Sequence, residues 1–297
     1  DQTAANTVDV SVVVIGRNEG TRLLDCLRSV HAAHWADLRY ELIYVDSGSS
    51  DGSADHAAAL GARVICVQPL RPSAALGRNA GWRAALAPLV LFLDGDTLLH
   101  PAFVHAAQQD LHGHPERAAI WGHRRERYPM QTVFNRVLDL DWVYPAGDTA
   151  FCGGDALFRR SALAEVDGFN DNLIAGEEPE LCARLRQRGW RIWHIDHPMT
   201  LHDLAITRWR QYWLRAERAG HAYAEVSHRL ADTPIPLWKN ENKRHRMHSL
   251  ALLLFIFLLC LALLTQAFAA AGMGAGLAVA GLARTAWRAR WKGGSAL

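Results

Sequence analysis

The sequence predicts an α/β fold in which a mostly parallel sheet is flanked by helices, followed by a C-terminal transmembrane helical hairpin. Over the first 110 residues, runs rich in β-branched residues alternate with segments of helical periodicity, which indicates parallel strands. A long apolar block near the C-terminus indicates the membrane part. We expect a globular domain over residues 1–235, a basic amphipathic connection over 236–248 and a membrane region over 249–297.

The elements predicted for the N-terminal part follow one another in regular order. Strands are expected at 8–16, 40–48, 62–68 and 89–96, with helices at 18–33, 53–60 and 73–87 between them. Parallel strands bring their carboxyl ends to one edge of the sheet, where ligands bind in this fold class. Polar residues stand at these ends: Asp46, Asp94, Asp96, and Arg17 to Glu19 in the loop after the first strand. From about 111 to 235 the pattern is less regular.

Composition excludes some classes of protein. Half of the 297 residues are hydrophobic and the net charge is only +2, so nothing indicates a nucleic-acid partner. The five cysteines form no CxxC pair, which favours a reducing compartment over a disulfide framework. The first residues lack the basic segment and apolar core of a signal peptide. We therefore expect the globular domain in the cytoplasm.

Two apolar segments near the C-terminus are long enough to cross a bilayer. A spanning helix needs about 20 residues; residues 247–266 provide them, and 267–287 do so mostly with Ala and Gly. Basic clusters at 239–248 and 284–292 flank the block, and since basic loops stay cytoplasmic, a hairpin of two crossings satisfies both. A buried helical pair in a soluble protein is the alternative.

The stretch LVLFLDGDTLLHP, residues 89–101, ends a buried strand with two carboxylates. Asp94 and Asp96 are two residues apart, so their side chains leave a strand on the same side and can converge. Two such charges repel unless a cation lies between them, and oxygen ligands suit Mg²⁺ or Mn²⁺. The alternative is a strand that simply ends in an Asp-Gly turn.

Seven segments occur in an order typical of one enzyme family: VSVVVIGRNEG, VDSGSSDGS, GRNAGW, LFLDGDT, FCGGDALFRRSALAEVDGFND, AGEEPELCARLRQRGWRI and LHD. Over residues 9–215 the chain thereby resembles the family 2 glycosyltransferases, which have the GT-A fold. The resemblance implies that residues 1–235 form a GT-A catalytic domain that takes a nucleotide-sugar donor, most often a UDP-sugar.

The same resemblance implies roles for the residues at the strand ends. Nucleotide contacts are implied for Gly16, Arg17, Glu19, Asp46, Asp51, Arg78 and Asp94, with Asp46 at the base. Asp51 either serves the ribose or only caps the following helix. Asp94 and Asp96 correspond to the DxD motif, and His202 to a histidine that completes the ligand shell of Mn²⁺ or Mg²⁺.

The acidic segment GEEPEL is expected to supply the catalytic base. In an inverting transfer, a carboxylate removes the proton of the acceptor hydroxyl as that oxygen attacks the anomeric carbon. The family usually has Glu-Asp here, whereas this chain has Glu177-Glu178; Glu178 therefore falls on the base position, and Glu177 is able to share the role. The same acids also suit a helix N-terminus.

Two further segments are implied on the acceptor and diphosphate side: Gly153, Gly154 and Asp155 in one, and Arg208, Trp209 and Arg210 in the other. The second segment either holds the diphosphate and stacks on a sugar or lipid, or forms an amphipathic helix that rests on the membrane. Ala205 stands where processive synthases have the Gln of their QxxRW motif, which argues against a processive polymer synthase.

These features predict a metal-dependent inverting glycosyltransferase at the inner, cytoplasmic membrane, with the catalytic domain facing the cytoplasm. The expected acceptor is lipid-linked or a polysaccharide. One alternative is a nucleotidyltransferase, although VVVIGRNEG lacks the Gly-rich basic loop that such enzymes need. The other alternative is a catalytically inactive, transferase-like membrane scaffold.

Overall fold

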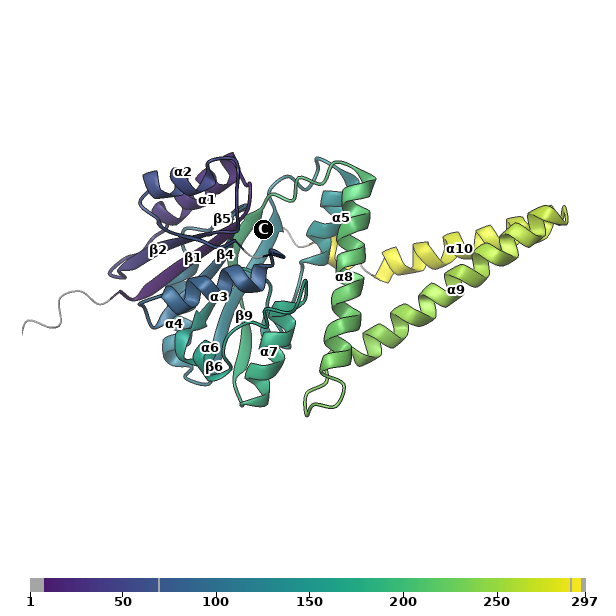
Figure 1. Cartoon of the computed structure of the whole chain (residues 1–297). Helices are drawn as coiled ribbons and strands as arrows, with labels where there is room; N and C mark the ends of the chain where they lie inside the picture. Colours follow the sequence, from purple (N-terminus) through teal and green to yellow (C-terminus); the bar gives the residue numbers. More distant parts are fainter. Residues whose placement is uncertain (1–7, 69, 289, 295–297) are drawn as a thin grey trace, which may run out of the picture. The chain divides into compact units, whose positions relative to one another are not determined.

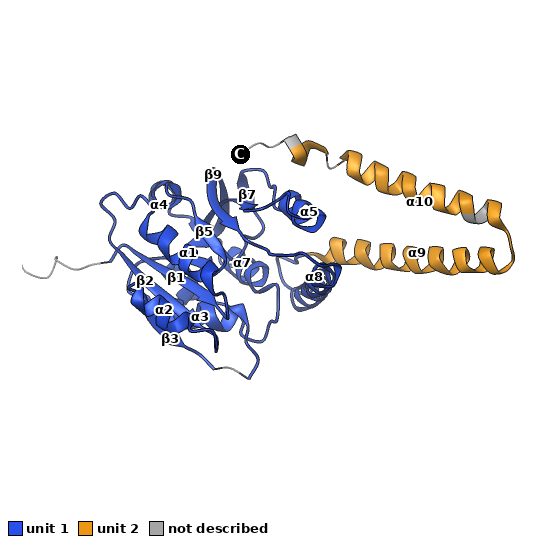
Figure 2. Cartoon of the chain, turned by 90° about the horizontal axis from the view of Figure 1, so that it is seen from above, with its two compact units in different colours: residues 1–237 blue, residues 238–297 orange. Residues whose placement is uncertain are grey.

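The computed structural model describes residues 8–68, 70–288 and 290–294. The chain forms two compact units, residues 1–237 and 238–297 (Figure 2). The larger unit is built around one sheet whose strand order is β3-β2-β1-β4-β8-β6-β9-β5, with β7 added beside β9. Helices flank this sheet (Figure 1).

The N-terminal half of the sheet is parallel, as the alternation of elements predicts. Its strands are β1 Val10–Gly16, β2 Tyr40–Asp46, β3 Arg63–Cys66 and β4 Leu89–Asp94. The connecting helices are α1 Thr21–His31, α2 Ser53–Ala59 and α3 Ala74–Ala84. Strands β1 and β4 are almost continuously apolar because both faces of the sheet are covered and buried. The ends of β1, β2 and β4 therefore meet at one edge.

The C-terminal half of the sheet is mixed. Its elements are β5 Thr97–Leu99, α4 Phe103–Gly113, β6 Arg117–Glu126, α5 Val133–Asp141, β7 Gly147–Thr149, β8 Ala156–Arg159, α6 Arg160–Glu165, α7 Glu177–Gln187, β9 Arg191–His202 and α8 Trp209–Arg229. Strand β8 is antiparallel to β4 and β6, while β9 is parallel to β6 and antiparallel to β5 and β7. The long strand β9 thereby returns the chain to the edge where β4 ends.

Helix α5 is fixed to β6 by one buried carboxylate. Asp139 accepts hydrogen bonds from Nε and Nη2 of Arg125, both at 2.7 Å, and from the backbone N–H of Glu126 at 3.0 Å. Arg136 adds an ion pair at 3.0 Å. Because Asp139 has no solvent exposure, these contacts replace the hydration that its charge loses on burial.

The second unit contains α9 Lys239–Leu264, α10 Phe268–Arg288 and the 3₁₀ turn η1 Arg290–Gly294. Among the described residues, α9 is the one helix long and apolar enough to cross a membrane. It begins inside the basic segment, so much of the predicted connection and the predicted first crossing form one continuous helix. Helices α9 and α10 run side by side (Figure 2). The second crossing remains a prediction, as does the division at residues 235 and 248.

Candidate functional site

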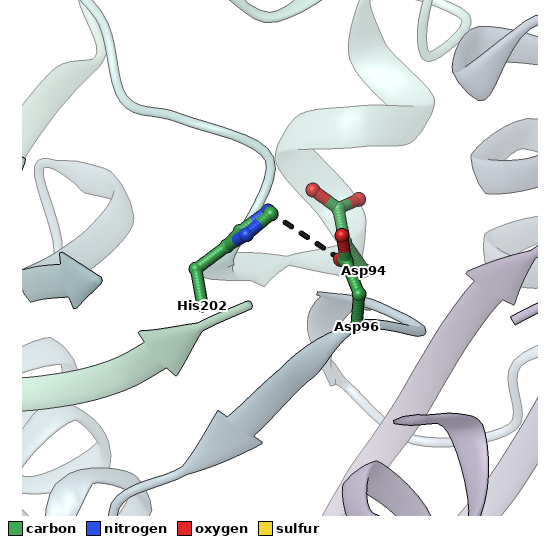
Figure 3. A group of neighbouring side chains, drawn as sticks. All are labelled: Asp94, Asp96 and His202. Atoms are coloured by element: carbon green, nitrogen blue, oxygen red, sulfur yellow. Dashed lines mark ion pairs between the residues drawn. The ribbon is translucent and has the colours of Figure 1, made fainter. Parts of the chain in front are cut away.

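The pairing of β5 with β9 brings the two predicted parts of a metal site together. In this antiparallel pair Thr97 lies opposite His202, so the histidine at the end of β9 reaches Asp96 in the turn after β4. Nε2 of His202 lies 3.4 Å from Oδ1 of Asp96 (Figure 3). One ligand atom from each of Asp94, Asp96 and His202 lies within 4.8 Å of the others. Residues more than a hundred positions apart thus share one point.

The electrostatics of this cluster fit a divalent cation. Burial and the charges of Asp94 and Glu19 raise the pKa of Asp96 to about 8, because desolvation and neighbouring carboxylates both disfavour its ionised form. Burial and Arg124 lower the pKa of His202 to about 3, so its imidazole is neutral and can donate a lone pair to a metal. Two carboxylates and a neutral imidazole are a ligand set suited to Mn²⁺.

Asp94 is held in place from two sides. Nη2 of Arg78 lies 2.9 Å from its Oδ1. Its backbone N–H donates to Oδ1 of Asp155 at 3.0 Å, and the other oxygen of Asp155 accepts from Thr200 Oγ1 at 2.8 Å. Burial opposes ionisation of Asp94, but Arg78 outweighs it and lowers the pKa of this carboxyl. Asp155 therefore links β4 to β9 next to the candidate metal ligands. Burial and the charge of Asp94 raise the pKa of Asp155 to about 6.

Arg78 also connects the candidate metal ligands, Asp94, Asp96 and His202, to the predicted catalytic base. Its guanidinium, only 2% exposed, lies 2.9 Å from Glu178 and 3.0 Å from Glu177 at the start of α7. One cation faces three carboxylates, so burial and the charge of Glu178 raise the pKa of Glu177 to about 7. The Glu178 side chain is the more exposed of the two acids, 16% against 8%. Glu178 is therefore the more accessible of the two carboxylates.

Two glycines make this arrangement possible. A Cβ on Gly154 would clash with Arg78 and would lie 2.9 Å from Asp94 Oδ2 and 3.2 Å from Glu178 Oε1. Gly176, with a φ of 83°, caps α7 in the left-handed region that disfavours side chains. The Gly-Gly segment thus allows the backbone to approach the charged groups closely, whereas a Cβ on Gly176 would meet Val226 and Ala222 of α8.

Apart from Arg78 on α3 and Asp94 on β4, the residues predicted to contact the nucleotide lie at the ends of β1 and β2 and in the loops that follow. Asp46 is buried, and its Oδ2 accepts from the backbone N–H groups of Gly48 and Ser49 at 3.1 and 2.9 Å. Asp51 precedes Gly52, the N-cap residue of α2; its Oδ1 accepts from the N–H of Ser53 at 3.1 Å, and its Oδ2 accepts from the N–H of Gly20 at 3.0 Å. The two loops are thereby bound to each other.

The remaining predicted nucleotide residues belong to the β1 loop itself. Gly16 ends β1, and a Cβ there would lie 3.1 Å from Cγ of Glu19. Arg17 is exposed. Glu19 forms a 2.6 Å ion pair with Arg22, and burial raises its pKa. Arg22 also lies 3.9 Å from Asp96, a neighbour that sequence reasoning missed.

Arg208, Trp209 and Arg210 do not join this site in the described part of the chain. They begin α8, where Oε1 of Gln211 accepts from the N–H groups of Thr207 and Arg208 at 3.0 and 2.9 Å. Trp209 is 60% exposed and contacts Phe134 of α5, with ring centroids 6.1 Å apart. The local geometry of this segment is thus that of a helix start with an exposed aromatic surface.

A cavity beside the cluster of Asp94, Asp96 and His202 includes Gly153 and Asp155, which are predicted on the acceptor side, but its aromatic wall was not predicted from the sequence. It has a volume of about 160 Å³ and is lined by Trp121, Arg124, Asp141, Trp142, Tyr144, Phe151, Cys152, Gly153, Asp155 and Met199. Trp142 connects it to the metal cluster, since its ring lies 5.3 Å from that of His202. The basic and aromatic composition of residues 121–145 is a second sequence signal for this region, beside the Gly153-Gly154-Asp155 segment.

Comparisons with known proteins agree with this geometry. The family model described as glycosyl transferase family 2 matches residues 11–167. The pre-mycofactocin glycosyltransferase of Mycobacterium tuberculosis is 25% identical over 245 residues, which cover 77% of this chain and 50% of the relative. The probable glycosyltransferase YdaM of Bacillus subtilis is 21% identical, with 70% and 54% covered. The chain thus spans about half the length of these two relatives.

Two solved structures share the fold. The mannosyltransferase PcManGT from Pyrobaculum calidifontis, in complex with GDP-Man and Mn²⁺, superimposes with a TM-score of 0.68 at 20% identity, over 97% of this chain and 84% of that one. TarS 1-349 of S. aureus, in complex with UDP-GlcNAc, gives a TM-score of 0.55 at 15% identity, over 74% and 66%. At these identities the likeness is one of fold.

Proposed function

The chain belongs to glycosyl transferase family 2, and we propose that it catalyses metal-dependent, inverting transfer of a sugar from a nucleotide-sugar to a lipid-linked or polysaccharide acceptor. The observation that carries the proposal is the buried guanidinium of Arg78, which lies 2.9 Å from both Asp94 and Glu178. Arg78 thus contacts both Asp94, which is suited to hold a diphosphate through a metal, and Glu178, which is suited to deprotonate an acceptor.

The metal would be held by Asp94, Asp96 and His202, and when bound it would neutralise charge on the departing diphosphate. Glu178 takes the proton of the acceptor hydroxyl, while that oxygen forms a bond to the anomeric carbon. The bond from this carbon to the diphosphate oxygen breaks, and its electron pair leaves with the nucleoside diphosphate. Arg78 fixes the orientation of the Glu178 carboxylate.

We propose a UDP-sugar as the donor. Family membership supports a nucleotide-sugar, and the neighbouring structures were solved with UDP-GlcNAc in one case and GDP-Man in another. The β1 and β2 loops would form the nucleotide site. Asp46 would contact the nucleobase, and Gly16, Arg17, Glu19 and Asp51 would line the rest of the site. A GDP-sugar is the competing donor, and direct measurement separates the two.

We further propose that the enzyme works at the cytoplasmic face of the inner membrane. Helix α9 is apolar enough to span a bilayer, and basic residues precede its apolar part. In the larger unit, α5 and α8 carry exposed apolar side chains: Val133, Val137, Trp209, Trp213 and Leu214. Arg208 and Arg210 adjoin them, and such an aromatic and basic surface suits the interface of an anionic bilayer.

The proposal is tested by turnover with the full chain in bilayer nanodiscs. Radiolabelled UDP-glucose, UDP-GlcNAc and GDP-mannose are each supplied with Mn²⁺ or with EDTA, and release of the nucleoside diphosphate is measured in a membrane extract that provides acceptors. We expect release from one donor class, only with metal, and its loss in Glu178→Gln. A folded chain that releases nucleotide from none of these donors would instead support the inactive scaffold.

A further inference from the structure

Arg124 on β6 differs from two neighbouring arginines, Arg125 on the same strand and Arg127 just after it. Arg125 pairs with Asp139 at 2.7 Å and Arg127 with Asp25 at 3.1 Å. For Arg124, no ion pair with a carboxylate is formed within the described ranges 8–68, 70–288 and 290–294. Since successive side chains of a strand point to opposite faces, Arg124 and Arg125 lie on opposite faces of the sheet.

The Arg124 guanidinium is instead held against an aromatic ring. It lies 4.3 Å from the centroid of Trp142, a cation–π contact that fixes the position of the charge without neutralising it. The guanidinium of Arg215, on α8, lies 5.9 Å from the same ring. For Arg215 as well, the described residues provide no carboxylate partner. Two positive charges thus share one tryptophan.

These charges adjoin the cavity of about 160 Å³, and Arg124 forms part of its wall. Four aromatic side chains, Trp121, Trp142, Tyr144 and Phe151, supply much of the rest. A half-buried guanidinium is costly to desolvate unless it meets an anion. Its planar N–H groups match the oxygens of a phosphate in two-pronged hydrogen bonds.

The position of the cavity identifies the substrate that would enter it. Cys152, Gly153 and Asp155 line the cavity, while Gly154 between them lies against Glu178 and Asp94. Asp46 and Asp51 of the nucleotide loops do not line it. The cavity therefore lies beside the proposed base and the proposed metal site, and not among the β1 and β2 loops proposed to hold the nucleoside, a position that suits an acceptor.

We propose that this cavity binds a phosphate-bearing acceptor, with Arg124 and Arg215 on the phosphate and the aromatic walls around the group attached to it. The inference rests on the proposed function and specifies its acceptor. The phosphate belongs either to a lipid carrier or to a free sugar phosphate, and both present the same dianionic group. Asp141, in the same wall, is placed to accept a hydrogen bond from a hydroxyl of the acceptor.

The test uses the full chain in detergent micelles and measures binding of farnesyl phosphate, farnesol and glucose 6-phosphate by calorimetry. Variants are Arg124→Ala, Arg124→Lys and Arg215→Ala, with Arg28→Ala as a control at an exposed arginine. A charge-assisted hydrogen bond contributes about 1.5–3 kcal/mol. We therefore expect Arg124→Ala to weaken binding of the phosphate probe about 10- to 100-fold, and Arg124→Lys to weaken it less.

Each arm decides a separate point. Arginine-dependent binding of farnesyl phosphate alone supports a lipid-linked acceptor, and similar dependence for glucose 6-phosphate supports a soluble one. Equal affinity for farnesyl phosphate and farnesol, together with no arginine-dependent binding of glucose 6-phosphate, overturns the inference. A second outcome also overturns it: the Arg124→Ala variant binds farnesyl phosphate and glucose 6-phosphate as well as wild type does but binds UDP with Mn²⁺ more weakly. Arg124 would then bind the donor and not the acceptor. Nucleotide binding by the wild-type chain tests the proposed function independently.

Discussion

Nη1 of Arg78 lies 2.9 Å from Oε1 of Glu178, and both groups are largely withdrawn from solvent. The same guanidinium contacts Asp94 through its other terminal nitrogen. The proposed proton acceptor and the proposed metal site are therefore connected by a single side chain of α3. A change at Arg78 has to affect both.

Removal of this cation is expected to destabilise the fold. In Arg78→Ala, Glu177, Glu178 and Asp94 would face one another without compensation, and breaking a buried pair in this way typically costs about 3–5 kcal/mol. Thermal unfolding in detergent measures the loss. The matched control is Arg83→Ala on the same helix, whose exposed pair with Asp167 at 3.3 Å is expected to contribute less than about 1 kcal/mol. Equal unfolding temperatures for the two variants would contradict the role of Arg78.

Substitution at the two glutamates distinguishes the base from its neighbour. Glu178→Gln should reduce turnover about 10²- to 10⁴-fold, the usual contribution of general-base catalysis, with nucleotide binding retained. Glu178→Asp restores the carboxylate with one methylene fewer and should recover part of the rate. Glu177→Gln should retain more activity than Glu178→Gln, because Glu177 is the more buried acid. The reverse order of these two variants would assign the base to Glu177.

A methyl group at Gly154 should impair catalysis while the fold persists. The Cβ of Gly154→Ala would press on Arg78 and lie 2.9 Å from Asp94 Oδ2, so charged groups at the site must shift. We expect at least a tenfold loss of turnover, about 1.4 kcal/mol. Gly220→Ala on α8 is the control, since a Cβ there meets no atom within 4 Å and alanine favours helix. Full activity in Gly154→Ala would show that the close approach is dispensable.

Glu177 should make the stability of the fold depend on pH. Its pKa is raised from an ordinary 4.5 to about 7, so its stabilising contribution is complete below about pH 4.5 and is lost as the pH rises through about 7. Glu177→Gln cannot ionise and should lose less stability between pH 5 and 8, by a difference on the order of 1–3 kcal/mol. Unfolding temperatures across this range provide the measurement, and Glu217→Gln at an exposed position of α8 is the control. Parallel pH profiles for wild type and Glu177→Gln would refute the shift.

Much of the N-terminal half could be predicted from the sequence, because each element there is defined by local periodicity. The predicted strand at 89–96 and β4 Leu89–Asp94 differ only at the C-terminal end. Asp94 and Asp96 lie close together as predicted, but Asp96 lies in the turn after β4, so the turn and not the alternation of strand side chains brings them together. The encounter of Asp96 with His202 depends on the pairing of β5 with β9, and resemblance to a family, rather than local pattern, suggested it.

The aromatic and basic wall of the cavity, unlike Gly153 and Asp155, could not be predicted, and the reason is physical. In the run HRRER, Arg124 and Arg125 look equivalent, and only the face of β6 that each occupies separates the ion-paired arginine from the one stacked on Trp142. The mixed half of the sheet could not be predicted for a similar reason. Strands β8 and β9 pair with strands distant in sequence, and such pairing leaves no periodic signal in the sequence. For Arg208 and Trp209, the sequence left two roles open, and the described contacts are those of an exposed helix start.

The most direct measurement is calorimetric titration of the full chain with UDP, GDP and dTDP, with and without Mn²⁺, in wild type and in Asp96→Asn. If Asp94, Asp96 and His202 hold a metal that carries the donor diphosphate, one nucleotide should bind tightly only with Mn²⁺, and Asp96→Asn should lose that metal-dependent gain while remaining folded. Nucleotide binding that is unchanged by Mn²⁺ or by Asp96→Asn, or no nucleotide binding by the folded chain, would contradict the proposed site.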